Sequence, residues 1–412
     1  MIHFLRHQAE QIWRTPFVFG MLLALSVNAP GQTSDRSAIF NVRNYGAKGD
    51  AATDDSVAIA SAAAAAAATA ANGRPASLYF PSGVYRLVAA LPTFTAPVSV
   101  LGDGHAQSVI LVDTSFSGDV FSWSNTSDEH AEPLREPADG ARVEIEGIRI
   151  VGDRTTANLQ NAFVFYDRAD HVLMQNVDVF YMTGRVLYSG VSQRTSQAYM
   201  TASRFDSLRF FNCGSAGIAT VDFNSHGGGA GTSEVSVNAL DIYAPHGPGA
   251  VIHSDGPPIH AIRFSELRIE GLENGTISSD LLQVGDASLS GKVSDIEFAQ
   301  TYLIDPYFGF AAIRFTAPGM SSAPAEVRFD GFINGGLPNG KGIVIDAGRS
   351  LFLKISGMHT TDINVTVASS ATVGGPIVLN GYGLERSWTR SIEPSSAANV
   401  TIPVLQPFSP KP

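Results

Sequence analysis

The stretch Ile262-Arg-Phe-Ser-Glu-Leu-Arg-Ile269 has apolar residues at its first, third, sixth and eighth positions. Alternation on both sides of a two-residue break is typical of two short strands that meet at a tight corner, each with one face buried. The pattern recurs along the chain. Its other copies are Val143/Ile145/Ile148/Ile150, Val172/Met174/Val177/Val179, Phe205/Leu208/Phe210, Val235/Val237/Leu240/Ile242, Val293/Ile296/Phe298, Val327/Phe329/Phe332 and Leu353/Ile355/Met358.

The copies recur at a nearly regular interval. Their third apolar positions fall at residues 148, 177, 208, 240, 267, 296, 332 and 358, so the spacing runs from 26 to 36 residues. Such a period indicates a solenoid, because a unit this small buries its apolar face only by stacking on its neighbours. Leucine-rich repeats are the competing solenoid of similar period, but their fixed frame of Leu and Asn is missing.

A third apolar run lies between copies, and Gly or Ala opens most of these runs. The runs are 162–165, 217–219, 249–252, 281–284, 312–315, 342–345 and 376–379. Three strands per repeat, with no helical segment between them, predict an all-β fold. We expect a single-stranded parallel β-helix with three sheets and about nine to ten coils.

Length and composition agree with one long solenoid domain, which we expect over residues 38–383. The chain has 412 residues and 44% apolar content, enough for a large core, although length alone would suggest two or three globular domains. The formal net charge of −11 argues against nucleic acid as a partner, because phosphate binding needs a basic surface. It does not argue against a sugar.

Residues 1–37 have the pattern of a signal peptide followed by a short mature tail. Arg6 and Arg14 precede an apolar run of 11 residues, Phe17 to Val27. This run is too short to span a bilayer, which takes about 20 residues. We therefore expect a periplasmic or secreted protein without membrane association after export. The alternatives are an uncleaved anchor and a start codon assigned too far upstream.

The segment 40–86 predicts a helix that covers the first coil. Thr53 or Asp54 can cap its first turn, an Ala-rich tract with high helix propensity follows, and Asn72-Gly73 is a plausible stop. We expect the helix at about residues 54–72. The open end of a solenoid exposes apolar surface and strand edges that such a helix can cover. A disordered Ala-rich linker is the alternative.

Three motifs in this region carry a family resemblance: Tyr45-Gly-Ala-Lys-Gly-Asp50 with Thr53-Asp-Asp55, Tyr79-Phe-Pro-Ser-Gly-Val-Tyr85, and Val98-Ser-Val-Leu-Gly-Asp-Gly104. The sequence resembles the N-terminal cap and first coil of the pectate-lyase-like right-handed β-helix superfamily. That superfamily includes polygalacturonase-related proteins, rhamnogalacturonases, uronan epimerases and phage tailspike depolymerases. The resemblance implies a right-handed coil and a polysaccharide substrate. It also implies that Asp50, Asp54 and Asp55 are structural.

The resemblance does not carry over a catalytic residue set. The polygalacturonase motifs Asn-Thr-Asp, Gly-Asp-Asp, Gly-His-Gly and Arg-Ile-Lys do not occur in the repeat region. It does imply a location, because in this superfamily the sugar chain usually lies across the strand that follows the corner unit. That strand is the third apolar run, and its outward polar residues are our candidate substrate contacts: Tyr166, His253, Gln283, Arg314 and Asp346.

The loop Asp222-Phe-Asn-Ser-His-Gly-Gly-Gly-Ala-Gly231 is the strongest candidate for a site. Its glycines let backbone approach a ligand closely, while Asp222, Asn224 and His226 supply acid, hydrogen-bonding and base capacity. One repeat later comes His253-Ser-Asp255. We expect Asp222, His226, His253, Asp255 and Arg314 to be catalytic, and Tyr166, Asn224, Gln283 and Asp346 to bind substrate. A flexible turn with solvated histidines is the alternative.

Two reactions remain open. Hydrolysis of a glycosidic bond needs two carboxyl groups, for which Asp222 and Asp255 are the first pair to test. β-Elimination needs a group that neutralises the uronate carboxylate and a base at the adjacent carbon, and His226, His253 or Arg314 qualify. Arginine suits the neutralising role better than that of base. Some members of the superfamily use calcium, but the repeats contain no compact acidic string for it, so we expect no cofactor and no metal.

Residues 384–412 leave the repeat pattern and contain five prolines. We expect them to form a C-terminal capping tail with Val400 to Val404 extended, in a monomer or, if the tail trimerises, a homotrimer. The sequence thus predicts an exported enzyme that cleaves a polysaccharide by hydrolysis or elimination. A non-catalytic glycan-binding or adhesive β-helix is the alternative, in which the missing motifs mean that there is no chemistry.

Overall fold

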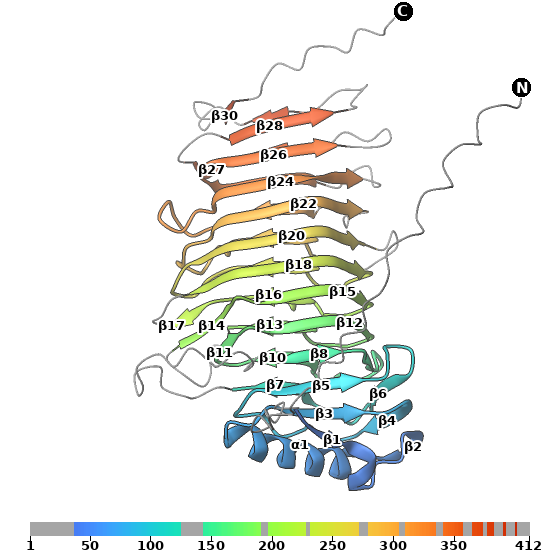
Figure 1. The fold of residues 1–412 in the computed structure, drawn as a ribbon. Helices are drawn as coiled ribbons and strands as arrows, with labels where there is room; N and C mark the ends of the chain where they lie inside the picture. The colour runs from blue at the N-terminus through green and yellow to red at the C-terminus, as the bar shows by residue number, and fades with distance from the viewer. Residues whose placement is uncertain are drawn as a thin grey trace, which may run out of the picture. The chain divides into compact units, whose positions relative to one another are not determined.

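A computed structural model describes residues 37–124, 143–190, 197–227, 231–271, 279–304, 310–334, 341–356, 365–373, 377–382, 390–392 and 400–401. The predicted targeting segment, apart from Ser37, and most of the predicted C-terminal tail lie outside the described residues. Parallel strands stack from one coil to the next (Figure 1). The predicted parallel β-helix is confirmed.

One sheet contains the two strands of each corner unit. In the longest strands the chain passes through the corner without interruption, as in β18 (Thr232–Tyr243), β20 (Ile259–Glu270) and β22 (Ser294–Ile304). We call the part before the corner the first arm and the part after it the second arm. The other strands of this sheet are β1 (Ala38–Asn41), β2 (Asp50–Asp54), β3 (Ala76–Phe80), β4 (Gly83–Leu87), β5 (Val98–Gly102), β6 (Ser108–Val112), β8 (Glu144–Glu146), β9 (Arg149–Val151), β11 (Arg168–Asp170), β12 (Leu173–Phe180), β14 (Gln197–Thr201), β15 (Arg204–Phe211), β17 (His226–Gly227), β24 (Ala325–Asn334), β26 (Leu351–Ser356), β28 (Ile377–Tyr382) and β30 (Val400–Thr401).

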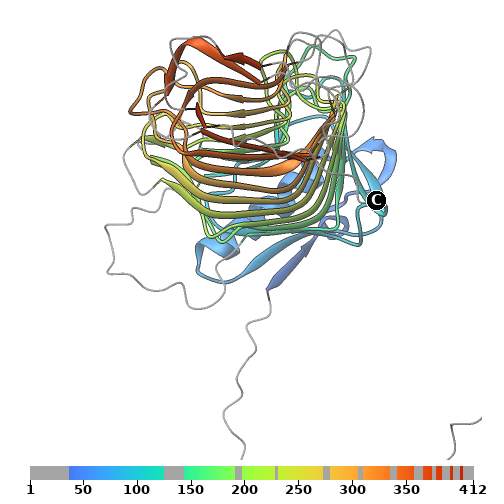
Figure 2. The same ribbon diagram turned by 90° about the horizontal axis from the view of Figure 1, so that it is seen from above.

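The third runs form a sheet of their own, with ten strands in the described part of the chain. Seen along the stack, successive coils superimpose (Figure 2). We call this sheet the third sheet. Its strands are β7 (Gly118–Trp123), β10 (Gln160–Phe165), β13 (Leu187–Ser189), β16 (Val221–Phe223), β19 (Ala250–Ile252), β21 (Leu282–Val284), β23 (Ala311–Phe315), β25 (Lys341–Gly348), β27 (Val365–Val373) and β29 (Arg390–Ile392).

Two of the predicted third runs were wrong. Residues 217–219 lie in a turn closed by hydrogen bonds between Ser215 and Ile218, and the strand is β16, which begins at Val221. Residues 376–379 overlap β28, which pairs with β26 and not with the third sheet. The run β13 was missed because it has three residues and no Gly or Ala opening it.

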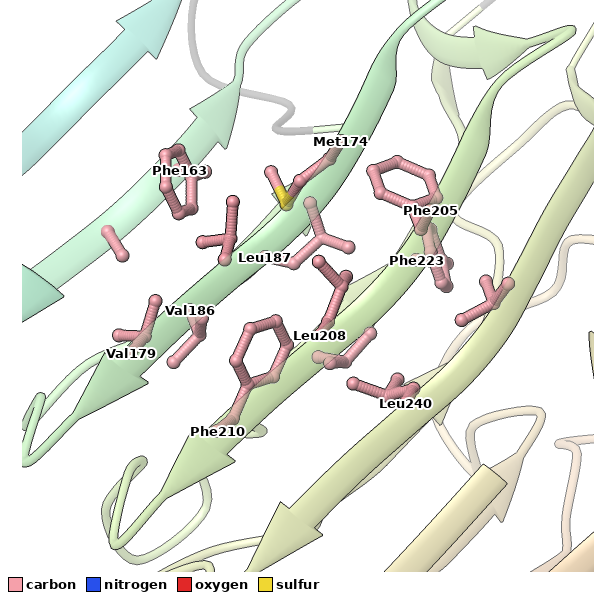
Figure 3. Packing of buried hydrophobic residues seen from close by; sticks show 14 of the residues in the cluster. Phe163, Met174, Val179, Val186, Leu187, Phe205, Leu208, Phe210, Phe223 and Leu240 are labelled. Atoms are coloured by element: carbon pink, nitrogen blue, oxygen red, sulfur yellow. The ribbon is translucent and has the colours of Figure 1, made fainter. Parts of the chain in front are cut away.

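The corner pattern marks the core. All four apolar residues of the defining stretch, Ile262, Phe264, Leu267 and Ile269, are completely buried. Phe264 stacks on Phe298 of the next coil, with ring centroids 5.0 Å apart and 16° between the ring planes. Figure 3 shows the same packing lower in the stack, where side chains from both arms meet those of the third sheet in one interior.

One predicted repeat was shifted along the chain: Ile296 and Phe298 were assigned to positions after the corner but lie before it. Ile296 pairs with Ile262 and Phe298 with Phe264, so both lie on the first arm. The third position of that coil belongs to Thr301, which is completely buried. A polar residue at an apolar position hid the true register. Phe332 was also misplaced, because it pairs with Tyr302 outside the core, whereas Ile333 is buried.

The corners are made by single residues in the left-handed conformation. At the corner between the arms, Asn176, Ser207, Ala239, Glu266 and Gln300 have φ between 48° and 58°. The residues just before them pair from coil to coil, so these corner residues form a ladder of their own. A single left-handed residue turns the chain sharply, and non-glycine residues adopt this conformation at a cost. This is why two residues interrupt the alternation in the sequence.

The predicted N-terminal helix is α1 (Ser56–Ala71), preceded by a short 3₁₀ helix η1 (Val42–Tyr45). Its buried alanines join the core, and it lies at the β1 and β3 end of the stack (Figure 1). Asp54 Oδ1 accepts the backbone N–H of Ser56 at 2.9 Å. Asp55 is buried and accepts the backbone N–H groups of Lys48 and Gly49, a structural role that agrees with the family resemblance.

The C-terminal segment continues the ladder in the two places where it is described. β29 pairs with β27 and β30 pairs with β28, although both strands lie in the segment predicted to be a lid. The number of coils stays a prediction, because parts of this region lie outside the described residues. Within the described ranges, α1 is the one α-helix, and no helix has the length and apolar character needed to cross a bilayer.

Candidate functional site

The outer face of the third sheet carries a column of aligned residues. Tyr188, Asp222, Val251, Gln283 and Arg314 pair in this order on β13, β16, β19, β21 and β23. Their neighbours on each strand, such as Val221 and Phe223, point into the core. Asp222 is therefore part of a strand and not of the loop where we expected it.

Asp222 is the centre of the most highly connected cluster on this face. It is 3% exposed, and its two oxygens bind different cations. Oδ1 accepts a hydrogen bond from His253 Nε2 at 2.8 Å, and Oδ2 accepts one from Arg185 Nε at 2.7 Å. Burial by itself raises the pKa of a carboxyl, but the hydrogen bond from His253 and the two positive charges outweigh it, so the pKa of Asp222 is lowered.

His253 lies between two carboxylates. Its Nε2 binds Asp222, and its Nδ1 lies 3.6 Å from Asp286 Oδ2, an ion-pair distance too long for a good hydrogen bond. Burial would lower the pKa of this imidazole, but the two carboxylates outweigh burial and raise the pKa of His253 to about 9. His253 is therefore a cation at neutral pH and can act as an acid or an electrostatic clamp. It is poorly suited to act as a base.

A second His–Asp pair follows on the same two coils. His226 Nδ1 lies 2.8 Å from Asp255 Oδ2, and the side chains are 26% and 46% exposed. A carboxylate accepts the proton on Nδ1, so the neutral imidazole keeps a free lone pair on Nε2. This arrangement suits a general base. The pairing arises because the chains after β16 and β19 continue side by side, with His226 and Asp255 in a parallel bridge.

Asn224 contacts the backbone next to the second pair. Its side-chain oxygen accepts the backbone N–H of Asp255 at 3.2 Å, and its Nδ2 donates to the Gly190 carbonyl at 3.3 Å. Asn224 is 7% exposed, so its side chain is largely buried and its polar atoms are used by backbone groups. We interpret it as a residue that positions Asp255. The substrate-binding role expected from the sequence stays a prediction.

The remaining sequence candidates lie further along the third sheet. Arg314 is three strands from Asp222, about 14 Å at roughly 4.8 Å per strand. It binds Asp280 and, at 2.6 Å, Asp346, so these form a separate ion cluster. Gln283 donates to the Gly285 carbonyl at 3.0 Å. Tyr166 donates its hydroxyl to Asp119 at 2.5 Å, two strands before Asp222.

Three members of the central cluster were missed from the sequence: Arg185, Tyr188 and Asp286. The guanidinium of Arg185 lies over the Tyr188 ring, 4.2 Å from its centroid. Burial, with the charge of Asp222, raises the pKa of Tyr188. Asp286 follows a third-sheet strand by two residues, and His253 follows one by a single residue. Post-strand polar residues on successive coils were the signal that could have revealed Asp286.

The arrangement supplies three kinds of groups within adjacent coils: a buried anion that holds two cations, a histidine that pairs with a carboxylate, and exposed carboxylate oxygen. In the described part of the chain, no group of three or more His, Cys, Asp or Glu side chains is arranged to hold a metal ion. The expectation that no metal or cofactor is needed stays a prediction.

Comparison with known proteins places this geometry in a wider context. Residues 39–226 match the family described as rhamnogalacturonase A/epimerase, pectate lyase-like. No curated protein matches the chain by sequence. The match begins in the N-terminal cap and ends at His226, so it includes Arg185, Tyr188 and Asp222.

Several solved structures have a similar fold at low sequence identity. ORF18 of Geobacillus virus E2 is 15% identical, with a TM-score of 0.51 over 85% of this chain and 62% of that protein. The A-module of mannuronan C-5 epimerase AlgE6 from Azotobacter vinelandii is 14% identical, with a TM-score of 0.48 over 88% and 97%. The Streptococcus pneumoniae adhesin PfbA is 14% identical, with a TM-score of 0.47 over 89% and 88%. The chain thus spans less than two thirds of the phage protein.

The stacked sheets define the class of this protein as a parallel β-helix. The N-terminal motifs and the family match over residues 39–226 support a relation to the pectate-lyase-like β-helix proteins. The resemblance predicted from the sequence is confirmed.

Proposed function

We propose that this protein is an enzyme that acts on a uronate-containing polysaccharide by proton abstraction, with β-elimination as the reaction. The observation that carries the proposal is the pairing of an accessible His226–Asp255 base with two cations held on buried Asp222. Proton abstraction next to a carboxylate needs both parts, a base and a positive charge that stabilises the developing anion.

The proposed mechanism assigns one step to each part. Arg185 and His253 neutralise the uronate carboxylate, which makes the adjacent carbon more acidic. His226 Nε2 removes the proton from that carbon, and Asp255 stabilises the imidazolium that forms. The electron pair then forms a carbon–carbon double bond, the glycosidic C–O bond breaks, and the leaving oxygen takes up a proton from water. His226 returns its proton to solvent afterwards.

The spacing of the two parts suits a single bound sugar. Asp222 and His226 are four residues apart, so their backbone positions are at most about 14 Å from each other. His226 and His253 lie on adjacent coils, where they bind Asp255 and Asp222. A sugar unit placed there can contact the cations through its carboxylate and the base through the neighbouring carbon.

Hydrolysis has weaker support. It requires one carboxyl group with a raised pKa as the acid. The pKa of Asp222 is lowered and both of its oxygens are occupied. The ion pair with His253 also lowers the pKa of Asp286. Asp222 and Asp255 each bind a different histidine, so we do not propose them as a hydrolytic pair.

The test is turnover of a panel of uronans and neutral polysaccharides, with product unsaturation and reducing ends followed together. We expect unsaturated product from a uronan. We expect His226→Ala and Asp255→Asn each to lower kcat by about 100-fold or more. His260→Gln, a histidine of β20 outside the cluster, is the matched control and should keep full activity. Reducing ends without unsaturation would identify hydrolysis and contradict the proposal.

A non-catalytic glycan-binding or adhesive protein is the alternative function. Such a protein would bind a polysaccharide on the panel without forming any product. The wild type and the His226 and Asp255 variants would then all leave the polymer intact. Export to the periplasm or the medium, and a monomeric or trimeric state, remain part of the proposal. Sedimentation and cell fractionation test them.

A further inference from the structure

The outer faces of the two arms differ in chemistry. On the first arm, Arg204, Ser236, Arg263 and Glu297 follow one another in register, a polar surface. On the second arms of β12, β15 and β18, which lie on successive coils (Figure 1), Phe180, Phe211 and Tyr243 follow one another instead. These three residues alternate with core residues, so they point away from the interior. The second arm therefore carries outward aromatic side chains that do not contribute to the packing of the interior.

The aromatic side chains form one contiguous cluster. Phe211 and Tyr243 stack with centroids 5.2 Å apart and 7° between the rings. Phe180 meets Phe211 edge-on at 6.0 Å, and Tyr181 meets Phe211 edge-on at 5.5 Å. All are outside the hydrophobic core, and Tyr181 is 37% exposed. Grouped aromatic surface that stays partly exposed is typical of a binding site.

Tyr181 occupies a conformation that a tyrosine rarely adopts. Its φ is 62°, in the left-handed region, whereas the equivalent corners of the next coils hold Asn212 and Ala244. A bulky residue at such a position costs free energy that the fold does not require. The tyrosine therefore has a backbone cost in stability, and the ring contacts that it makes are with the exposed aromatic cluster and not with the core.

Charged side chains border the aromatic cluster. Asp178 is 3% exposed, and its Oδ2 binds Arg149 Nη2 and Arg209 Nη2, both at 2.7 Å. Both guanidinium groups lie over the Phe180 ring, 5.0 and 5.5 Å from its centroid. The buried carboxylate thus holds two arginines in fixed positions, and the Arg209 side chain remains 51% exposed.

Asp241 adds an acceptor on the next coil. It pairs in register with Arg209, and its buried Oδ1 has no hydrogen-bond partner among the described residues. A buried acceptor without a partner costs about 1–3 kcal/mol. Fixed donors and acceptors next to an aromatic surface are what a sugar chain requires, because its rings have apolar faces and its hydroxyls need partners.

We propose that this face, defined by Phe180, Tyr181, Phe211 and Tyr243 with Arg209 and Asp241, is a second polysaccharide-binding site separate from the site on the third sheet. Sugar rings pack on the aromatic cluster, and their hydroxyls bind Arg209 and Asp241. The site holds the polymer without changing it. It does not depend on the proposed reaction.

Binding measurements in a His226→Ala background separate this site from turnover. The probes are alginate, polygalacturonate and a neutral glucan, each followed by calorimetry and by mobility in polysaccharide-containing gels. We expect Tyr181→Asn and Arg209→Gln each to weaken binding of at least one probe by about tenfold. Arg263→Gln, an exposed arginine of the first arm that pairs with Glu297, is the matched control and should bind like the parent.

Thermal unfolding shows whether a variant binds more weakly because it is unfolded. Asparagine suits the left-handed corner better than tyrosine, so Tyr181→Asn should unfold at the same or a higher temperature while binding more weakly. Unchanged affinity in both variants overturns the proposal, as does the absence of binding to every probe. Loss of turnover in His226→Ala, or failure to find turnover at all, has no bearing on this result.

Discussion

Asp222 illustrates what a sequence can predict at the scale of single residues. The types and order of Asp222, His226, His253 and Asp255 pointed to this part of the chain, and all four lie on adjacent coils. Their partners could not be predicted. Which histidine meets which carboxylate depends on the register between coils, and that register is set by loop lengths and corner positions. The sequence paired Asp222 with Asp255, but each binds a histidine.

The raised pKa of His253 predicts a pH dependence of stability. Its pKa is about 9 in the folded protein, against an ordinary value of 6.5. The charged imidazole therefore stabilises the fold fully below pH 6.5, and this stabilisation is lost as the pH rises through 9. At about 1.4 kcal/mol per pKa unit, the loss is roughly 3 kcal/mol at most.

Urea unfolding of the wild type and of His253→Gln at pH 6 and pH 9.5 checks this prediction. The wild type should lose stability between the two values, and the variant should lose less because it has no imidazole to deprotonate. Equal losses in the two proteins would mean that Asp222 and Asp286 do not hold His253 in its charged form.

Corners are the feature that makes each element recognisable in the sequence. Two residues break the alternation because one of them adopts the left-handed conformation, and this break located most of the repeats. It failed where another residue disturbed the pattern. Buried Thr301 occupies an apolar position, so the repeat was placed on Val293 and Ile296. The three-residue strands β13 and β16 are too short for periodicity to identify.

The corner ladder predicts opposite effects for two reciprocal substitutions. Ala239 and Asn176 occupy equivalent corners with φ of 48° and 53°. Asparagine tolerates this conformation better than alanine, so Ala239→Asn should raise the free energy of unfolding by about 0.5–1 kcal/mol, and Asn176→Ala should lower it by a similar amount. Chemical denaturation measures both, and a shift of the same sign in the two variants would contradict the explanation.

At the scale of the whole molecule, stability depends on contacts between neighbouring coils. Phe264 is completely buried and contacts Phe298 on the next coil and Phe223 of the third sheet. Phe264→Ala should therefore lower the free energy of unfolding by about 3–5 kcal/mol through the cavity that it leaves. Because each coil contacts only its neighbours, the loss should be local.

Hydrogen exchange tests this locality. Amides of β18, β20 and β22 should lose protection in Phe264→Ala, while those of β3 and β5 near α1 should keep it. Uniform loss of protection along the chain would indicate a single cooperative unit. Leu87→Ala is a control cavity at the N-terminal end and should have the reverse distribution.

The fold was predictable because a solenoid repeats its pattern many times, so errors in single repeats do not change the conclusion. The candidate site occurs once, at the place where β16 and β19 end, and has no repetition to support it. The family resemblance suggested a face but did not provide its residues, since the motifs of polygalacturonases are absent from the repeat region.

The most direct test of the proposed activity is the product formed from a uronan by the wild type and by His226→Ala. The account predicts an unsaturated sugar at the new chain end with the wild type, and a loss of about 100-fold or more in its rate of formation with the variant. Cleavage that yields saturated ends, or an unsaturated product formed equally fast by both proteins, would contradict it.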